Sequence, residues 1–178
     1  DGLGMIARSS EIEALAQSAD PECGVYLVPA FTGLGAPYWD TEARGAIVGL
    51  TRDSGAPEIV RAALESVVYQ TRDLFEAMAA DGTTPASVRV DGGMAANDWT
   101  MQFLADVLSV RVERPINTET SVLGAAYLSA LGAGIYDSLD DVAANWQIDK
   151  TYTPTMVDAE RKRLYAGWLK AVAQTRGC

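Results

Sequence analysis

The sequence predicts an α/β fold whose sheet is substantially parallel. Short apolar runs alternate with longer segments whose apolar residues recur every three or four positions, and this alternation is typical of α/β folds. A strand also leads through a glycine pair directly into a helix, in "VRVDGGMAANDW" (88–99). No repeat, low-complexity tract or linker divides the 178 residues, so we predict one domain over 1–178.

The first half of the chain is predicted to hold two helices and two strands. Small and apolar residues indicate a helix over 3–18. Apolar runs at 24–31 and 45–50 indicate strands on either side of a loop rich in glycine and aromatic residues (32–45). The clearest helix begins at Pro57, which suits the first helical position. Its predicted buried face consists of residues spaced three and four apart: Val60, Ala63, Leu64, Val67, Thr71, Leu74, Phe75 and Met78.

The second half alternates strand and helix more regularly. Strands are predicted at 87–93 and at 110–115, where Pro115 ends the second strand. The helix between them (96–108) places its larger apolar residues on one side: Trp99, Phe103, Leu104, Val107 and Leu108. A helix at 121–134 consists of small and apolar residues, which favour close packing on a sheet. Two further helices are predicted near 138–145 and 158–174.

The composition excludes several classes of function. Acidic residues outnumber basic ones, 24 to 14, and the formal charge of −10 argues against nucleic acid as a partner. Histidine is absent, which rules out Ser-His-Asp and Cys-His catalysis and most transition-metal sites. No apolar run is long enough to span a membrane. Cys23 and Cys178 are expected to be inert thiols, and the predicted location is the cytoplasm.

The glycine pair is the best candidate for a binding site. Gly92 and Gly93 follow a strand, and ligands of α/β folds gather beyond the carboxyl ends of strands. A residue without a Cβ lets a flat or anionic ligand approach the backbone, although a plain tight turn explains the pair as well. Asn97 stands near the helix start, where its amide suits either a ligand contact or a helix N-cap. The segment is not a Walker A loop, and no carboxylate pair indicates a catalytic base or a metal site.

Several segments in a fixed order resemble the FGGY family of carbohydrate kinases, and the glycerol kinases within it. They are "PAFTGLGAPYW" (29–39), "GAIVGLTRDSGAPEIVRAALESVVYQTRDLFEAM" (45–78), "VDGGMAANDWTMQFLADVLSVRVERP" (90–115) and "LGAAYLSAL" (123–131), within a likeness that covers residues 24–172. The resemblance implies the actin-like, ribonuclease-H-like ATPase fold. The chain would be the C-terminal FGGY kinase domain, with a mixed sheet flanked by helices, without its first strands and without the N-terminal lobe.

The resemblance also implies a reaction, the transfer of the ATP γ-phosphoryl group to glycerol with Mg²⁺, giving sn-glycerol 3-phosphate. The family's nucleotide contacts correspond here to Gly93 and Asn97, with Gly92 as the adjoining turn. The family's catalytic aspartate, glycerol-binding side chains and main phosphate-binding turn precede the matched region. We therefore expect a piece of a longer kinase that binds glycerol mainly through a missing N-terminal part. The whole protein is expected to be a homo-oligomer, dimer or tetramer, and this chain alone to be inactive.

Two alternatives stay open. The nearer one is another sugar kinase of the same family, specific for xylulose or gluconate, although the "PAFTGLGAPYW" loop favours glycerol. The other is a non-catalytic, actin-like interaction module that binds a partner and not ATP.

Overall fold

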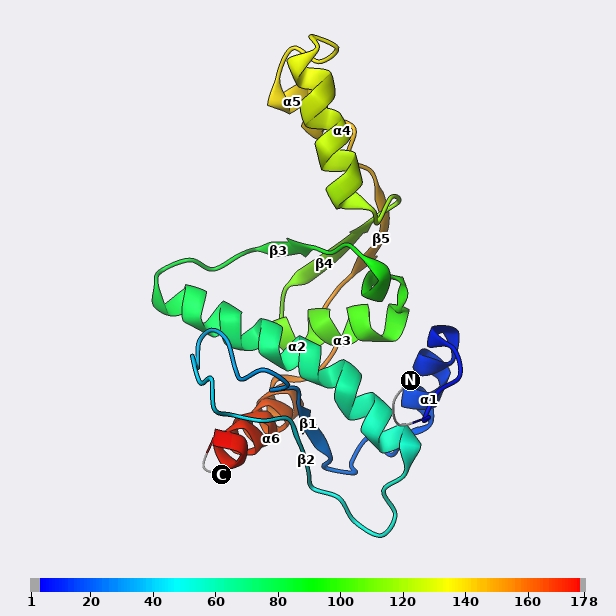
Figure 1. The fold of residues 1–178 in the computed structure, drawn as a ribbon, viewed down its shortest axis with the longest axis vertical. Coiled ribbons are helices and arrows are strands. Elements are labelled where there is room, and N and C mark those ends of the chain that lie inside the picture. Colours follow the sequence, from blue (N-terminus) through cyan, green and yellow to red (C-terminus); the bar gives the residue numbers. More distant parts are fainter. Residues whose placement is uncertain (1–3, 177–178) are drawn as a thin grey trace.

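Figure 1 shows the computed structural model of the chain, which describes residues 4–176. Helices and strands alternate as the sequence predicts, and three-residue strands replace the longer runs expected at 24–31, 45–50 and 87–93. The elements, with 3₁₀ helices marked η, are η1 (Ser9–Glu11), α1 (Ile12–Ser18), β1 (Tyr26–Val28), β2 (Ala46–Val48), α2 (Ala56–Ala80), β3 (Ser87–Arg89), η2 (Gly93–Ala96), α3 (Asp98–Leu108), β4 (Arg111–Pro115), α4 (Thr120–Gly132), α5 (Leu139–Ala143), β5 (Ile148–Tyr152) and α6 (Asp158–Arg176).

The strands form two small sheets. In the larger one the order is β3–β4–β5, with β3 parallel to β4 and β5 antiparallel to it. β1 and β2 form a separate antiparallel pair. The expectation of a substantially parallel sheet was therefore wrong, whereas the mixed sheet implied by the family resemblance is confirmed. Strand β5 was not predicted, because only Tyr152 of its five residues is buried and the segment lacks an apolar pattern.

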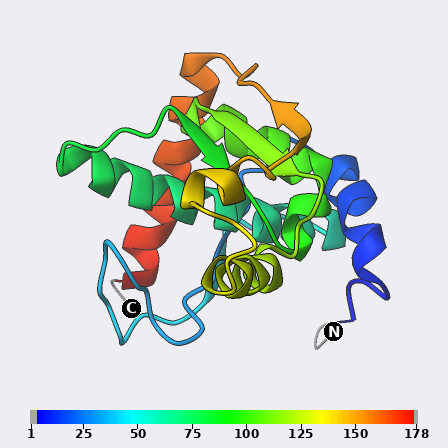
Figure 2. The same cartoon turned by 90° about the horizontal axis from the view of Figure 1, so that it is seen from above.

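One aromatic cluster forms the centre of the core between α2, α3 and α6. The ring of Tyr69 on α2 stacks on Trp168 of α6, with 5.5 Å between centroids, and meets Phe103 of α3 edge-on at 5.7 Å. Trp168 and Tyr69 are almost completely buried. In both Figure 1 and Figure 2, α1 and α6 lie on opposite sides of this core. Of these helices, α3 packs on β4 and β5, whereas α2 and α6 pack on β1.

The buried face of α2 differs from the predicted one. Val67, Leu74 and Met78 are 38–45% exposed, while Glu65 and Asp73 are buried. These two carboxylates have partners inside the protein: Glu65 accepts hydrogen bonds from Arg61 and Tyr69, and Asp73 accepts them from Tyr165 and Trp168. A polar group that keeps its hydrogen bonds can be buried. Val60 and Leu64 are buried as predicted, so hydropathy periodicity placed the first part of this face correctly and the second part wrongly.

The N-terminal helix is shorter than predicted. Regular helix begins at Ser9 in η1 and continues in α1 to Ser18, so 4–8 are not helical. Gly4 has φ +63°, in the left-handed region, and does not continue a right-handed helix. Leu3 and Cys178, which entered the sequence predictions, lie outside the described residues. Cys23 has a free thiol.

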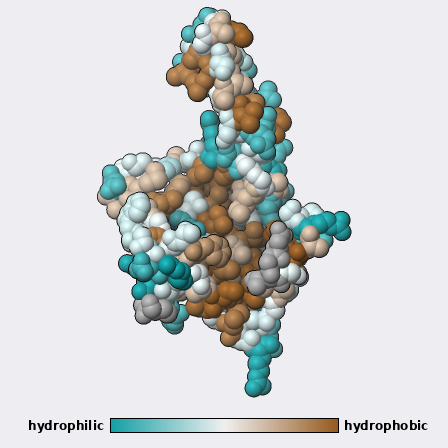
Figure 3. All heavy atoms as spheres, viewed as in Figure 1, coloured by the Kyte–Doolittle hydropathy of each residue, from teal (hydrophilic) through white to brown (hydrophobic). Residues whose placement is uncertain are grey.

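Helix α4 extends away from the body together with α5 (Figure 1). The predicted close packing of this helix on the sheet was wrong, because none of its residues is buried. Val122 is 71% and Leu128 65% exposed, and hydrophobic surface is visible on this projecting arm in Figure 3. A helix that is apolar on every side has no stripe that marks a packing face. Within residues 4–176, no helix is long and apolar enough to cross a membrane.

Candidate functional site

The glycine turn lies beyond the carboxyl end of the parallel pair β3–β4. After β3, the N–H of Val90 still donates to the carbonyl of Glu113 beside it, at 3.1 Å. The chain then turns at Gly92, whose φ of +78° and ψ of 178° form a conformation that residues with a Cβ rarely adopt. The N–H of Gly92 donates to the carbonyl of Thr118 at 2.9 Å, so the turn is attached to the segment that follows β4. The backbone itself therefore requires glycine at position 92.

Gly93 has a different environment. Its φ is not positive, and a Cβ built on it meets no atom within 4 Å. The residue is exposed at the first position of η2. Neither backbone strain nor packing within the described chain explains a glycine here. The space beside it is open, as close approach of a ligand to the backbone requires.

Asn97 joins η2 to α3. Its side-chain Oδ1 accepts a hydrogen bond from the N–H of Thr100 at 2.8 Å, so the N-cap alternative is confirmed. Within the described part of the chain, its Nδ2 takes part in no hydrogen bond. An amide that caps with its oxygen still has two N–H donors to offer. Capping and ligand contact are therefore compatible at this residue.

The structure brings Gly92, Gly93 and Asn97 together around one short turn. The N–H of Ala95 donates to the carbonyl of Gly92 at 3.1 Å, and that of Asn97 donates to Met94 at 3.0 Å. Asp91, just before the turn, accepts a hydrogen bond from the hydroxyl of Thr120 in the first turn of α4. The turn is thus fastened at both ends.

Sequence reasoning missed a network of charged and polar side chains beside this turn. Asp98, the first residue of α3, accepts hydrogen bonds from Arg114 at 2.8 Å, Lys150 at 2.6 Å and Tyr152 at 2.6 Å. The hydrogen bonds from Lys150 and then from Tyr152 lower the pKa of the Asp98 carboxyl well below its usual range. The residues come from α3, β4 and β5, and β5 was not predicted. The one feature that could have indicated the network is that Arg114 and Lys150 lie opposite each other on β4 and β5.

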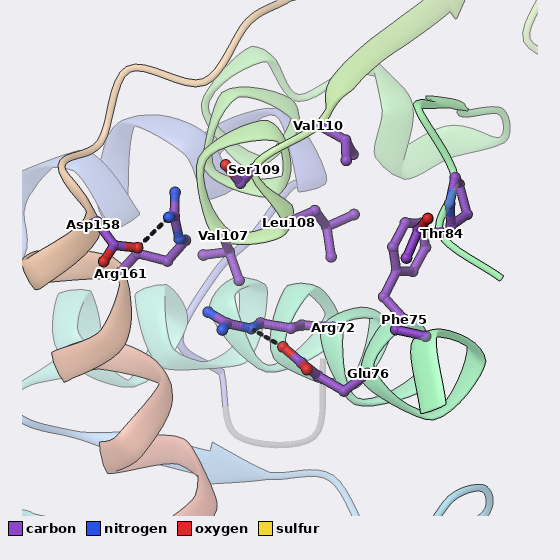
Figure 4. Close-up of a pocket in the computed structure, with 12 residues that line it drawn as sticks. Arg72, Phe75, Glu76, Thr84, Val107, Leu108, Ser109, Val110, Asp158 and Arg161 are labelled. Carbon is purple, nitrogen blue, oxygen red and sulfur yellow. Dashed lines mark hydrogen bonds and ion pairs between the residues drawn. The ribbon is translucent and has the colours of Figure 1, made fainter. Parts of the chain in front are cut away.

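Two cavities lie outside the turn, and the second of them borders it, because Thr120 lines that cavity and donates to Asp91. One, of about 300 Å³, is enclosed by α2, α3 and the start of α6, and its charged residues form the internal pairs Arg72–Glu76 and Arg161–Asp158 (Figure 4). The other, of about 350 Å³, lies between the end of β4 and helices α4 and α5. None of the three predicted nucleotide residues lines either cavity.

The side chains present fit a nucleotide better than a metal ion. Gly93 leaves its backbone open, and Asn97 has a spare donor. Among residues 4–176, no three acidic or cysteine side chains are placed to hold a metal ion together. Mg²⁺ is commonly bound through substrate phosphates and one or two carboxylates. This part of the chain therefore offers no metal cage of its own.

Comparison with known proteins identifies the family. The model of the C-terminal domain of the FGGY family of carbohydrate kinases matches residues 4–133. The chain belongs to this family. It is 58% identical over 177 residues to glycerol kinase of Ectopseudomonas mendocina, and 58% identical over 176 residues to glycerol kinase 1 of Pseudomonas aeruginosa. Each alignment covers 99% of this chain and 36% of the relative, so the chain spans about a third of the length of these curated relatives.

Solved structures agree with this assignment. Glycerol kinase of Plasmodium falciparum, crystallised with ADP, matches 98% of this chain and 35% of its own, with a TM-score of 0.86 and 35% identity. Xylulose kinase of Lactobacillus acidophilus matches 98% of this chain and 37% of its own, with a TM-score of 0.80 and 26% identity. The chain thus has the actin-like ATPase fold of sugar kinases, as the resemblance implied.

Proposed function

We propose that this chain is the C-terminal, nucleotide-binding domain of an ATP-dependent glycerol kinase, which converts glycerol to sn-glycerol 3-phosphate. The observation that carries the proposal is the turn from Gly92 to Asn97. It combines an open backbone with an unused amide donor, beyond the carboxyl end of a parallel strand. The 58% identity to curated glycerol kinases and the fold shared with an ADP-bound glycerol kinase support it.

The geometry favours adenosine as the part of the nucleotide that lies on this turn. A flat group can rest against the backbone of Gly93, and Nδ2 of Asn97 can donate to an acceptor on it. Gly92 shapes the turn, and Gly93 directly after it is exposed. Mg²⁺ would be held by the ATP phosphates, and the chemistry it would supply is neutralisation of the charge that develops during phosphoryl transfer.

Phosphoryl transfer needs more than this domain. It depends on positioning and charge stabilisation around the transferred group, and we propose that a preceding lobe supplies the catalytic base and most contacts to glycerol. In this account residues 1–178 form one domain that closes against that lobe. Assembly of the whole protein into a dimer or tetramer and a location in the cytoplasm stay predictions from the sequence.

The comparisons favour glycerol over xylulose and gluconate as the acceptor. Identity to curated glycerol kinases reaches 58%, against 26% to the xylulose kinase of Lactobacillus acidophilus and 24% to a gluconate kinase of the same organism. The turn from Gly92 to Asn97 is proposed to bind the nucleotide and not the acceptor. Its geometry therefore does not distinguish glycerol from xylulose or gluconate. An acceptor panel separates the candidates.

The test measures ATP consumption by the full reading frame with glycerol, xylulose or gluconate, and by the 178-residue chain alone. We expect turnover by the full protein with glycerol and none by this chain with any acceptor. Preference of the full protein for xylulose or gluconate would assign it to another branch of the family. Glycerol-dependent turnover by the 178-residue chain would contradict the need for a second lobe. Failure of the full protein to bind ATP would favour the interaction module.

A further inference from the structure

The turn that carries Gly93 and Asn97 has few restraints of its own. η2 is four residues long, and short 3₁₀ helices have poorer hydrogen-bond geometry than α-helices. It lies between an exposed Asp91 and the first turn of α3. The methyl group of Ala95 is buried, but the flanking residues Gly93, Met94 and Ala96 are exposed. Beyond the hydrogen bonds at its two ends, contacts from neighbouring elements therefore contribute to the shape of the middle of this turn.

Arg114 on the neighbouring strand β4 supplies that restraint. Its Nη1 donates to the carbonyl oxygen of Ala95 at 2.8 Å. Its Nε and Nη2 both lie 2.8 Å from Oδ2 of Asp149 on β5, which holds the guanidinium in one orientation. The side chain is only 14% exposed. A guanidinium fixed in this way is a rigid support for the carbonyl that it contacts.

The same nitrogen also connects the turn to α3. Nη1 of Arg114 donates to Oδ1 of Asp98 at 2.8 Å, in addition to the Ala95 carbonyl. Ala95 precedes Asn97 by two residues and Asp98 follows it directly. Tyr152 and Lys150 hold the Asp98 carboxylate from β5. Arg114 therefore holds the backbone before Asn97, at Ala95, and the side chain of the residue after it, Asp98.

We propose that Arg114 is a positioning residue for nucleotide binding. It holds the turn so that the Gly93 backbone and the Asn97 amide are in place before the nucleotide arrives, and it acts through Ala95 and Asp98 without touching the ligand. Its Nε, Nη1 and Nη2 all lie at hydrogen-bonding distance from protein oxygens. Preorganisation of this kind raises affinity because the bound conformation need not be ordered upon binding. The inference rests on the proposed function, since it concerns the same turn.

The test compares Arg114→Gln, Arg114→Lys and the unmodified 178-residue chain in titrations with ADP and Mg²⁺, followed by amide NMR. For Arg114→Gln we expect a roughly tenfold rise in the Kd for ADP. Without nucleotide, the amide signals of 93–97 should shift and exchange faster with solvent, while those of α6 stay in place. Lysine keeps the charge but cannot replace the planar fork, so Arg114→Lys should restore affinity only in part.

Two further variants make the outcome decisive. Arg111→Gln removes a cation from the same strand, where Arg111 pairs with Glu113 and not with the turn, and should leave the Kd within about twofold. Asn97→Ala tests the nucleotide site itself. Weak binding by Asn97→Ala with normal binding by Arg114→Gln would overturn the role of Arg114 and leave the proposed function standing. Saturable ADP binding unaffected by Asn97→Ala would overturn both.

Discussion

The backbone of Gly92 has φ +78°, whereas the φ of Gly93 is not positive and a Cβ built on it meets no atom within 4 Å. The two neighbouring glycines therefore respond differently to the same substitution. Gly92→Ala should destabilise the fold by about 1–3 kcal/mol, because the new Cβ meets an unfavourable backbone conformation. Gly93→Ala should leave stability within about 0.5 kcal/mol.

The affinity for nucleotide should depend on Gly93, the glycine whose substitution hardly changes stability. The methyl group of Gly93→Ala occupies the space that the proposed adenosine uses, so the Kd for ADP should rise roughly tenfold or more. Urea unfolding measures the first effect and ADP titration the second. A Gly93→Ala chain that binds ADP as well as the unmodified one would contradict contact at this residue.

Asp98 makes stability depend on pH in the acid range. Hydrogen bonds from Lys150 and Tyr152 lower its pKa in the folded state, so between that pKa and the ordinary value of about 3.9 the unfolded state binds more protons. The contribution of Asp98 is therefore fully present above about pH 4 and is lost as pH falls through the folded-state pKa. Asp98→Asn should flatten this part of the acid dependence of the unfolding free energy.

Urea unfolding at a series of pH values checks the prediction for Asp98. Asp53→Asn is the matched control, because Asp53 is exposed and its carboxylate makes no ion pair within the described residues. Equal acid dependence for the unmodified chain and Asp98→Asn would contradict a stabilising role for the Asp98 network.

Gly92, Gly93 and Asn97, the three site residues named from the sequence, lie at one turn. They could be predicted together because the turn is specified by residues adjacent in the sequence. A glycine pair between a strand and a helix specifies a turn through neighbouring residues alone. Arg114 and Lys150 could not be found in this way, since they reach the turn from strands 16 or more residues away along the chain. The family resemblance, and not the glycine pair by itself, pointed to nucleotide.

At the scale of elements, Asp73 fastens α2 to α6. Its carboxylate accepts hydrogen bonds from the hydroxyl of Tyr165 at 2.6 Å and from the indole N–H of Trp168 at 2.9 Å. Asp73→Ala removes both acceptors and leaves a buried indole donor without a partner, at a cost of about 1–3 kcal/mol. Tyr165→Phe, which removes only one hydrogen bond, should cost about 1 kcal/mol.

A double-mutant cycle in urea checks this junction. Because both substitutions remove the same hydrogen bond, their effects should not add, and the difference gives the coupling energy of Asp73 with Tyr165. Fully additive effects would contradict a shared interaction. These partners also explain why the second part of the α2 face was predicted wrongly, since Asp73 belongs to the core through residues about 90 positions away.

At the scale of the whole molecule, stability should be concentrated in the body and nearly absent from the α4–α5 arm. Trp168 is completely buried, so Trp168→Ala should destabilise the chain by about 3–5 kcal/mol. Leu128 on α4 is 65% exposed, so Leu128→Ser should change the unfolding free energy by no more than about 0.5 kcal/mol. A large loss of unfolding free energy in Leu128→Ser would contradict this and show that helix α4 is packed against another surface.

The alternation of strands and helices could be predicted from the sequence, because it follows from the short-range periodicity of apolar residues. The sugar-kinase fold could be predicted because several segments resemble the family in the same order. The sheet topology could not, since β5 is mostly exposed and its pairing with β4 is a long-range event. Nor could the position of α4, because an evenly apolar helix does not indicate what it packs against.

The central claim is that nucleotide binds at the turn from Gly92 to Asn97. The most direct measurement is a titration of the 178-residue chain with ADP and Mg²⁺, followed by backbone amide NMR, with Asn97→Ala in parallel. We predict saturable shifts centred on Gly92, Gly93 and Asn97, weakened in the variant. Saturable shifts centred elsewhere, or none at millimolar nucleotide, would contradict a nucleotide site that this chain forms at the glycine turn.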